Sequence, residues 1–152
     1  TGHQLAIRSF GSFALEREAE KQGTGITIVD DAQNLILRNT DLSASNVTAA
    51  FHLQISYRHV TATNDSYQIA NLFVRAEKAV PADCYLHIIS DAGNIGAGLE
   101  ILDEDAYSAA SDLTDGNVGV GITADANGWY VYLVNRAGFS VVAGFKATAI
   151  SG

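Results

Sequence analysis

Two acidic groups between residues 103 and 117 have the side chains that bind calcium. Asp103 and Asp105 form one group, and Asp112 and Asp115 form the other. Calcium prefers several hard oxygen ligands supplied by loops, and the two groups flank one expected loop. Their spacing departs from the EF-hand pattern, in which ligands alternate before a distant Glu. The four aspartates are therefore a candidate calcium site, and a solvated acidic loop is the simpler interpretation.

Aromatic residues near the end of the chain are the second candidate, because aromatic rings are a usual platform for sugars. The alternation of side chains along a strand places Trp129 on one face and Tyr130 and Tyr132 on the other. One face must pack into the core, so the other is free to bind a ligand or a subunit. The favoured interpretation is a core Trp with two half-buried tyrosines.

Catalytic residues are not recognisable in the sequence. It contains no G-x-S-x-G motif, and the glycine-rich segment 93–98 lacks the Lys of a phosphate-binding loop. His52 and His87 could meet across sheets with Asp83 as a third metal ligand, but solvent-facing or hydrogen-bonded histidines are the simpler expectation. We therefore expect no enzymatic activity, no catalytic residue and no cofactor other than calcium.

Composition and charge limit the classes of partner that we expect this protein to bind. The 152 residues are 47% hydrophobic and 17% charged, with a formal net charge of −8. The nine Lys and Arg residues are scattered, so neither nucleic acid nor an anionic membrane is an expected partner. No apolar run approaches the ~20 residues of a membrane span. Cys84 is the only cysteine, which excludes a disulfide framework within the chain, and we expect it to be buried.

The elements that would position these residues are short β-branched and aromatic segments separated by turns. Between Val47 and Thr61, apolar residues alternate with polar ones, which is typical of a strand with one buried face. The expected strands cover residues 25–29, 35–38, 47–61, 68–77, 84–90, 98–102, 117–123, 129–135 and 139–150. This pattern predicts an all-β fold, a two-sheet antiparallel β-sandwich of jelly-roll type. Asp103 to Asp112 is expected to form a loop or one helical turn.

The first 24 residues are expected to form an arm, and residues 25–152 a single β-sandwich domain. Ser12 to Gln22 has good helix formers, with a Ser that can cap the helix and Gly23 to stop it. Further upstream, Leu5, Ile7 and Phe10 belong to a segment that could act as an extended donor strand and form an interface.

Two segments carry a family resemblance. Gly128 to Ile150 has an aromatic strand, an Asn-x-x-Gly turn and a final aromatic strand, and it resembles the closing hairpin of small β-sandwich domains in tail and fibre proteins of tailed bacteriophages. Gly25 to Leu37 is similar to the opening hairpin of the same group. The resemblance covers about a third of the chain. It implies a structural virion protein that forms homo-oligomers and has no enzymatic residues.

Three functions remain open at this point. The preferred one is a structural subunit of a virion, in the tail or fibre or decorating the capsid, which assembles with itself and with other structural proteins. The absence of Met and of a signal-peptide pattern fits an intracellular start, although a cleaved leader would look the same. The second is an extracellular or cell-surface filament or pilus subunit assembled by N-terminal strand exchange. The third is a carbohydrate-binding module that uses Trp129, Tyr130 or Tyr132 to bind a glycan.

Overall fold

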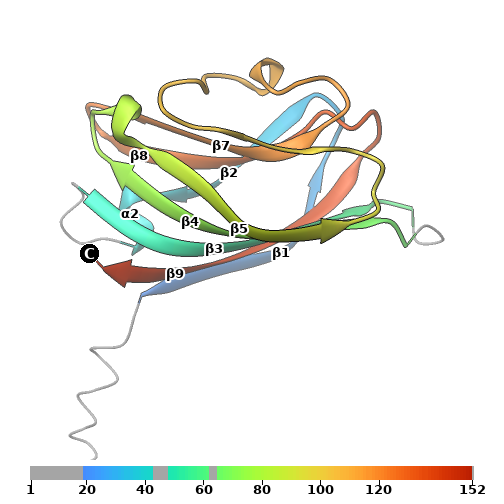
Figure 1. The fold of residues 1–152 in the computed structure, drawn as a ribbon, viewed down its shortest axis with the longest axis horizontal. Coiled ribbons are helices and arrows are strands. Elements are labelled where there is room, and N and C mark those ends of the chain that lie inside the picture. Colours follow the sequence, from blue (N-terminus) through green and yellow to red (C-terminus); the bar gives the residue numbers. More distant parts are fainter. Residues whose placement is uncertain (1–18, 43–47, 62–64, 152) are drawn as a thin grey trace, which may run out of the picture.

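The computed structural model describes residues 19–42, 48–61 and 65–151, which form two packed β-sheets (Figure 1). The five-stranded sheet has the order β1 (Glu20–Ile28), β9 (Val141–Ser151), β3 (Thr48–His59), β4 (Tyr67–Glu77) and β5 (Tyr85–Gly93). The four-stranded sheet has the order β2 (Ala32–Arg38), β8 (Gly128–Asn135), β7 (Val118–Asp125) and β6 (Leu99–Leu102). The predicted two-sheet sandwich is confirmed, and β1 beside β9 and β2 beside β8 give it a jelly-roll-like wrapping.

Helical structure among the described residues is short. It consists of the α-helix α2 (Asn39–Leu42) and the 3₁₀ helices η1 (Pro81–Asp83) and η2 (Ala110–Asp112). The last of these is the helical turn expected between Asp103 and Asp112. None of the helices in the described part of the chain has the length and apolar character that crossing a membrane requires.

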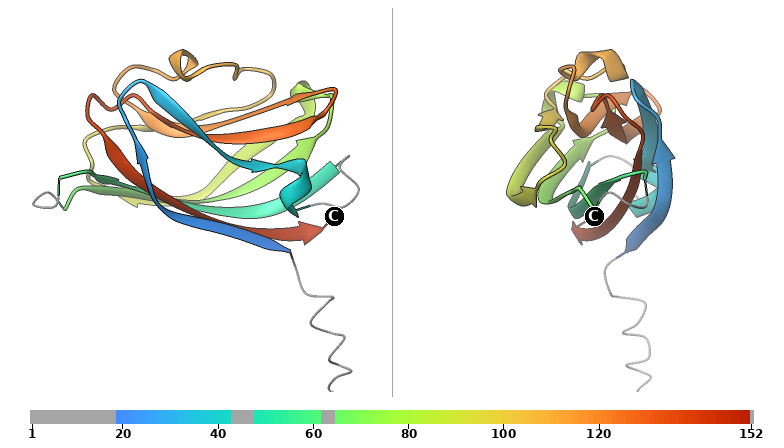
Figure 2. Two further views of the ribbon diagram at one scale, coloured as in Figure 1. Left: turned by 180° about the vertical axis from the view of Figure 1, so that it is seen from behind. Right: turned by 90° about the vertical axis from the view of Figure 1, so that its right-hand side faces the viewer.

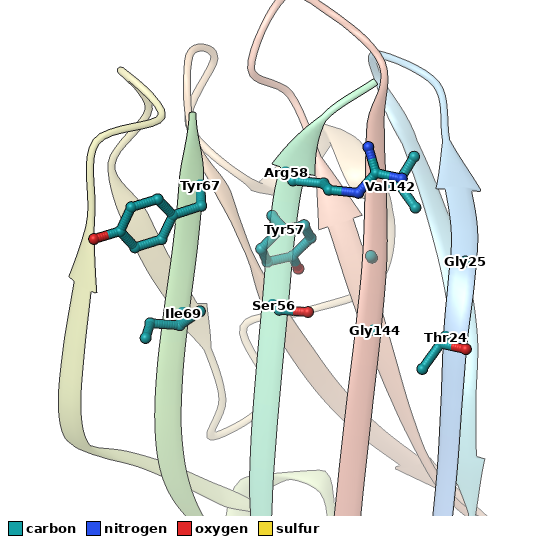
Figure 3. A pocket seen from close by; sticks show the side chains of 10 residues that line it. Thr24, Gly25, Ser56, Tyr57, Arg58, Tyr67, Ile69, Val142 and Gly144 are labelled. Atoms are coloured by element: carbon teal, nitrogen blue, oxygen red, sulfur yellow. The ribbon is translucent and has the colours of Figure 1, made fainter. Parts of the chain in front are cut away.

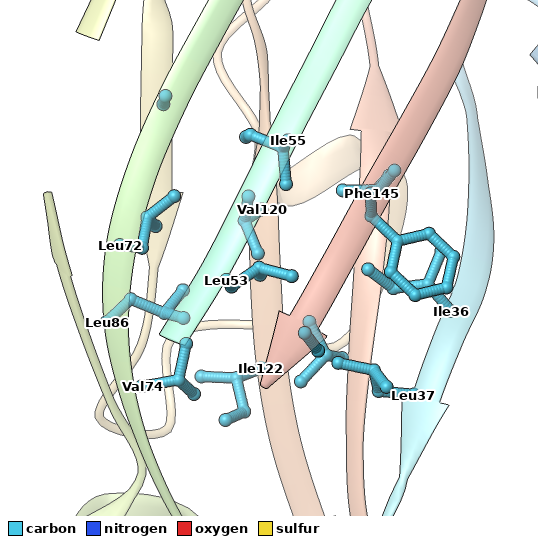
Figure 4. Packing of buried hydrophobic residues seen from close by; sticks show 14 of the residues in the cluster. Ile36, Leu37, Leu53, Ile55, Leu72, Val74, Leu86, Val120, Ile122 and Phe145 are labelled. Carbon is cyan, nitrogen blue, oxygen red and sulfur yellow. The ribbon is translucent and has the colours of Figure 1, made fainter. Parts of the chain in front are cut away.

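The hydrophobic core lies between the two sheets (Figure 4). Along β3, Phe51, Leu53, Ile55 and Tyr57 are buried and point toward the four-stranded sheet, as their alternation predicts. Trp129 on β8 is fully buried and stacks on Phe51, with 5.5 Å between the ring centroids. The core is thus built by side chains that alternate along strands of both sheets.

The two terminal hairpins expected from the sequence are wrong. β1 pairs with β9 and β2 pairs with β8, so the turn between β1 and β2 carries the chain from one sheet to the other. The turn between β8 and β9 does the same, because β9 pairs with β1 and β3. Turn residues and alternation locate two strands and a sharp change of direction, but they do not say whether the strands pair with each other.

The sandwich is also not purely antiparallel. β6 and β7 pair in parallel, with Leu99 opposite Val118 and Leu102 opposite Gly121. Parallel neighbours need a crossover connection of about a dozen residues or more. Residues 103–117 form that connection, and we refer to them as the crossover loop. The expected loop thus has a topological reason that its composition did not show.

The sandwich begins before the expected domain boundary. Glu20, Lys21 and Gln22, expected to end a helix, form the start of β1 and pair with Thr148, Ala147 and Lys146. Pairing with β9 fixes these residues as strand, because tertiary contacts override a weak helix propensity. Residues 1–18, which hold the rest of the expected helix and the candidate interface residues Leu5, Ile7 and Phe10, lie outside the described residues.

Candidate functional site

The outer face of the four-stranded sheet is covered by the crossover loop. Tyr107 and Leu113 from this loop are 2% and 1% exposed and form a second small hydrophobic cluster with Val134. The Tyr107 ring lies directly over Gly121, where a Cβ atom would come within 2.5 Å of the ring. Gly121 and Gly119 thus leave the space that the loop side chains fill. Figure 2 shows the loop on the far side of this sheet from the five-stranded one.

The side of the five-stranded sheet that faces away from the core is, in contrast, not covered by a loop of the described residues. In β4 the even positions are buried, while Tyr67, Ile69 and Phe73 point outward and stay 41%, 47% and 49% exposed. On the neighbouring strand β5, Tyr85 and Ile89 are 40% and 46% exposed. No described residue buries these five side chains. They are the largest exposed apolar group of the described residues that lies on one sheet face, and we refer to this surface as the outer face.

A groove crosses the outer face where small residues meet on neighbouring strands (Figure 3). Ser56 on β3 pairs with Gly144 on β9, and Gly25 lies at a bulge of β1 with a φ of +67°. Tyr67 and Ile69 form one wall of this hollow, whose volume is about 420 Å³. A volume of this size falls within the roughly 300–1,000 Å³ of ordinary ligand sites.

The groove continues along β3 and β9 into a second hollow. This hollow, of about 240 Å³, shares Thr24, Ser56 and Gly144 with the first and extends toward Gln54 and Lys146. We call the two hollows together the outer groove. Its surface combines an aromatic and an aliphatic wall with a floor of small residues and two cationic side chains, which suits an amphipathic partner.

Two cationic side chains mark the outer groove. Arg58 lies beside the first hollow and extends toward Val142 in Figure 3, and Lys146 lines the second. Arg58 is paired in register with Val142, four residues from Lys146, which corresponds to roughly 13 Å along the strand at about 3.3 Å per residue. Neither side chain forms an ion pair with a described residue, and the Arg58 Nη1 donates only one long hydrogen bond, 3.5 Å, to the His59 carbonyl oxygen.

A row of rings lies nearer the other end of the outer face. His52 on β3 and His87 on β5 are both paired in register with Phe73 on β4, and the His52 and Phe73 ring centroids are 5.3 Å apart. The two histidines therefore lie in the same sheet, on strands that β4 separates. The metal site imagined between them across the sheets is wrong.

The aromatic residues proposed from the sequence lie in the other sheet. Trp129 is fully buried in the core, so its assignment to a ligand surface is wrong and the core interpretation is confirmed. Tyr130 is half-buried, and its hydroxyl donates a hydrogen bond of 3.1 Å to Asp125. Tyr132 is half-buried against the ring of Tyr107, with 5.4 Å between the centroids. The crossover loop thus covers part of the surface that these tyrosines would have offered.

The four aspartates of the candidate calcium site do not converge. Asp103 accepts a hydrogen bond of 2.8 Å from the Leu86 amide, and Asp115 lies 3.7 Å from the Arg136 guanidinium. Asp112 accepts bonds from the backbone of Ser108 and Ala109, which hold the pKa of its carboxyl below the usual value. Asp105 is exposed. Within residues 19–42, 48–61 and 65–151, no three His, Cys, Asp or Glu side chains are arranged to hold a metal ion.

Cys84 is buried, as expected, and burial raises the pKa of its thiol. It lies just before β5, where its Sγ accepts a hydrogen bond from the Glu77 amide at 3.3 Å. Its place is structural.

The outer face itself was not identified from the sequence. The sequence pattern that could have indicated it lies in β4. The even-numbered side chains of this strand face the core, and Tyr67, Ile69 and Phe73 form a second, apolar row on the opposite face. A strand that is apolar on both faces indicates a covered sheet.

No protein-family model and no curated protein matches the chain. Among solved structures, the tailspike protein of Acinetobacter phage vB_ApiP_P1 is similar at a TM-score of 0.40 and 14% identity, over 86% of this chain and 22% of that one. The tailspike protein of Acinetobacter baumannii phage AM24 is similar at a TM-score of 0.40 and 11% identity, over 90% of this chain and 26% of that one. Both are bacteriophage tail proteins, in agreement with the weak resemblance found in the sequence. A similarity at this level carries no argument about function.

Proposed function

We propose that the chain is a non-catalytic structural subunit of a bacteriophage tail or fibre, and that it assembles with itself through the outer face of the five-stranded sheet. The observation that carries the proposal is the unequal covering of the two sheets. The crossover loop covers the four-stranded sheet, while Tyr67, Ile69, Phe73, Tyr85 and Ile89 remain 40–49% exposed on the other.

Exposed apolar side chains that gather on one face mark interaction sites, whereas single exposed ones are ordinary. The outer face also has the composition of interfaces, in which aromatic residues and Arg are enriched. Tyr67, Phe73 and Tyr85 supply the rings, and Arg58 and Arg75 lie beside them on β3 and β4. Placement in a phage tail or fibre rests on the sequence resemblance of the segments 25–37 and 128–150 to such proteins, although the structure pairs the strands of these segments with other strands and not as the hairpins that the resemblance implied.

The test is the solution mass of the purified chain, measured by light scattering coupled to size exclusion over a range of concentrations. We expect the wild type to associate and the double variant Ile69→Asp with Phe73→Asp to be monomeric, because two carboxylates would have to be buried in the interface. Val29→Asp is the matched control. Val29 is an apolar residue that is 57% exposed at the corner between β1 and β2, away from the outer face, and its replacement should leave association unchanged.

A wild type that is monomeric at the highest concentration, or a double variant that associates like the wild type, would contradict the proposal. Association that survives the double substitution but disappears on deletion of residues 1–11 would favour N-terminal strand exchange instead. Circular dichroism of each variant checks that the sandwich still forms.

A further inference from the structure

The outer groove is suited to a negatively charged partner. It carries Arg58 and Lys146 roughly 13 Å apart along the strand direction, and neither is neutralised by a described residue. The apolar wall of Tyr67 and Ile69 on β4 lies beside a floor of small side chains, such as Ser56 and Gly144, from the neighbouring strands. A partner with carboxylates on an exposed loop would therefore find both charge and apolar contact in one place.

This chain carries such a loop. Between residues 79 and 135 the sequence has nine Asp and Glu and no Lys or Arg, and the crossover loop lies within this stretch. Glu104 and Asp105, at the start of the loop, are exposed and form no ion pair with any described residue. The loop's other acids are engaged, since Asp103 and Asp112 accept backbone hydrogen bonds and Asp115 lies close to Arg136.

The groove and the loop lie on opposite sides of the molecule. The crossover loop runs over the outside of the four-stranded sheet (Figures 1 and 2). The groove is lined by outward-facing residues of the five-stranded sheet, such as Ser56, Arg58 and Ile69. The loop therefore cannot occupy the groove of its own chain. Two copies can join the two surfaces only in a head-to-tail manner, which leaves one free groove and one free loop at the ends of the pair.

Resting on the proposed function, we propose that the occupant of the outer groove is a second copy of this chain, whose Glu104–Asp105 turn docks between Arg58 and Lys146. The contact is heterologous, so it generates open chains of subunits, or a ring if the rotation between neighbours closes. Opposite charges set the direction of docking and disfavour the alternative in which two outer faces meet, because that arrangement would bring the cations of both copies together.

Two charge-reversal variants test the contact from both sides. The groove variant is Arg58→Glu with Lys146→Glu. The loop variant is Glu104→Lys with Asp105→Asn, where Asn is chosen because the backbone of Asp105 has a φ of +73° that Asn tolerates. Each variant alone should associate at least about tenfold more weakly than the wild type, since like charges would then face each other.

Mixing the two variants gives the sharpest result. In an equimolar mixture, the intact loop of the groove variant meets the intact groove of the loop variant, and the charge-reversed loop of the loop variant meets the charge-reversed groove of the groove variant. Opposite charges face each other at both contacts, so mixing should restore association of the two variants. The wild type should grow beyond a dimer, and its association should weaken as salt is raised. Arg38→Glu with Lys78→Glu, which changes the net charge by the same amount at two cations outside the groove and outside the ion pairs of the described residues, should behave like the wild type.

The outcomes separate this inference from the proposed function. If Ile69→Asp with Phe73→Asp abolishes association but the loop variant associates like the wild type, the outer face is an interface and the second copy's loop is not its occupant. A mixture of the two variants that stays monomeric also overturns the head-to-tail contact. A wild type that is monomeric throughout overturns both proposals.

Discussion

At the scale of single residues, side chains that are missing matter as much as those that are present. Gly119 and Gly121 on β7 leave room for the crossover loop, because a Cβ at either position would collide with atoms of Glu100, Leu113 or Tyr107. On the opposite sheet, Gly144 lines the outer groove and has no side chain that would fill it. The same residue type thus allows one sheet to be covered and the other to be hollowed.

Gly119→Ala is expected to destabilise the fold. The new methyl group would meet the backbone carbonyl oxygen of Glu100, which cannot move without disturbing the pairing of β6 with β7. Overpacking of this kind lowers the free energy of unfolding by about 1–3 kcal/mol. Urea denaturation followed by Trp129 fluorescence would measure the change.

Gly144→Ala is the matched control. Its Cβ would approach the Ser56 hydroxyl at 3.1 Å, a side-chain atom that can rotate away, and the Gly23 carbonyl oxygen at 3.3 Å, whereas at Gly119 the backbone oxygen of Glu100 lies at 2.1 Å. An equal loss of stability in the two variants would show that the close contact at Gly119 is not the cause.

At the scale of elements, the two corners that carry the chain between sheets are bonded to each other. The side chain of Asn135 at the end of β8 is fully buried and donates to the Ile28 carbonyl oxygen at 3.0 Å and to that of Phe139 at 2.7 Å. Asp30 accepts a hydrogen bond of 2.8 Å from the Gly138 amide. Arg136 binds Asp31 and also the Leu113 carbonyl oxygen in the crossover loop. Polar side chains thus join three segments distant in sequence.

Asn135→Ala should weaken both corners together. The two carbonyl oxygens would lose their donor inside the protein, and the Ala137 amide would lose the Asn135 oxygen that accepts from it at 2.9 Å. We expect a loss of about 2–3 kcal/mol in the free energy of unfolding. Hydrogen exchange should become faster in the turns at 29–31 and at 136–140.

Asn71→Ala serves for comparison, because the Asn71 amide makes one exposed hydrogen bond, to Ser90 at 3.2 Å, and should change stability by less than about 0.5 kcal/mol. If hydrogen exchange in the Asn135→Ala variant becomes faster in only one of the two turns, the two corners are not coupled through Asn135.

At the scale of the whole molecule, the two sheets are joined through the core by a polar contact as well as by packing. Tyr57 on β3 is fully buried, and its hydroxyl donates to the carbonyl oxygen of Gly119 on β7 in the other sheet. Burial raises the pKa of this phenol well above its ordinary value, because the charged form would be cut off from water. The protonated hydroxyl is the form that the sandwich accommodates.

Stability should therefore fall at high pH. A group whose pKa is raised by folding stabilises the native state below the unfolded pKa, which is about 10 for Tyr, and that stability is lost as the pH rises above it. At pH 7, Tyr57→Phe should lower the free energy of unfolding by about 1–2 kcal/mol, since a buried carbonyl oxygen loses its donor. Above pH 10, the variant should lose stability less steeply, by up to about 1.4 kcal/mol per pH unit. Parallel curves for variant and wild type in urea unfolding would contradict this account.

The candidate site could be predicted only in part. The exposed odd-numbered residues of β4 follow from alternation once the even-numbered row is known to face the core. The outer groove does not follow, because it needs Ser56, Gly144 and Gly25 to meet from three strands that are far apart in the chain. Trp129 was a more conspicuous candidate for a binding surface in the sequence. Its alternation with Tyr130 placed the two side chains on opposite faces of a strand, and Trp129 is the one that lies in the core.

Most of the strands could be predicted from the sequence, because the alternation of buried and exposed side chains is a local property of extended backbone, but the first residues of β1, Glu20 to Gln22, were assigned to a helix. The sequence by itself also determined the all-β class and the buried place of Cys84. The tertiary structure decided which strands pair, and so turned two expected hairpins into corners and made β6 parallel to β7. Pairing depends on contacts between residues distant in sequence, which no local pattern encodes. The covering of one sheet and the exposure of the other follow from that pairing.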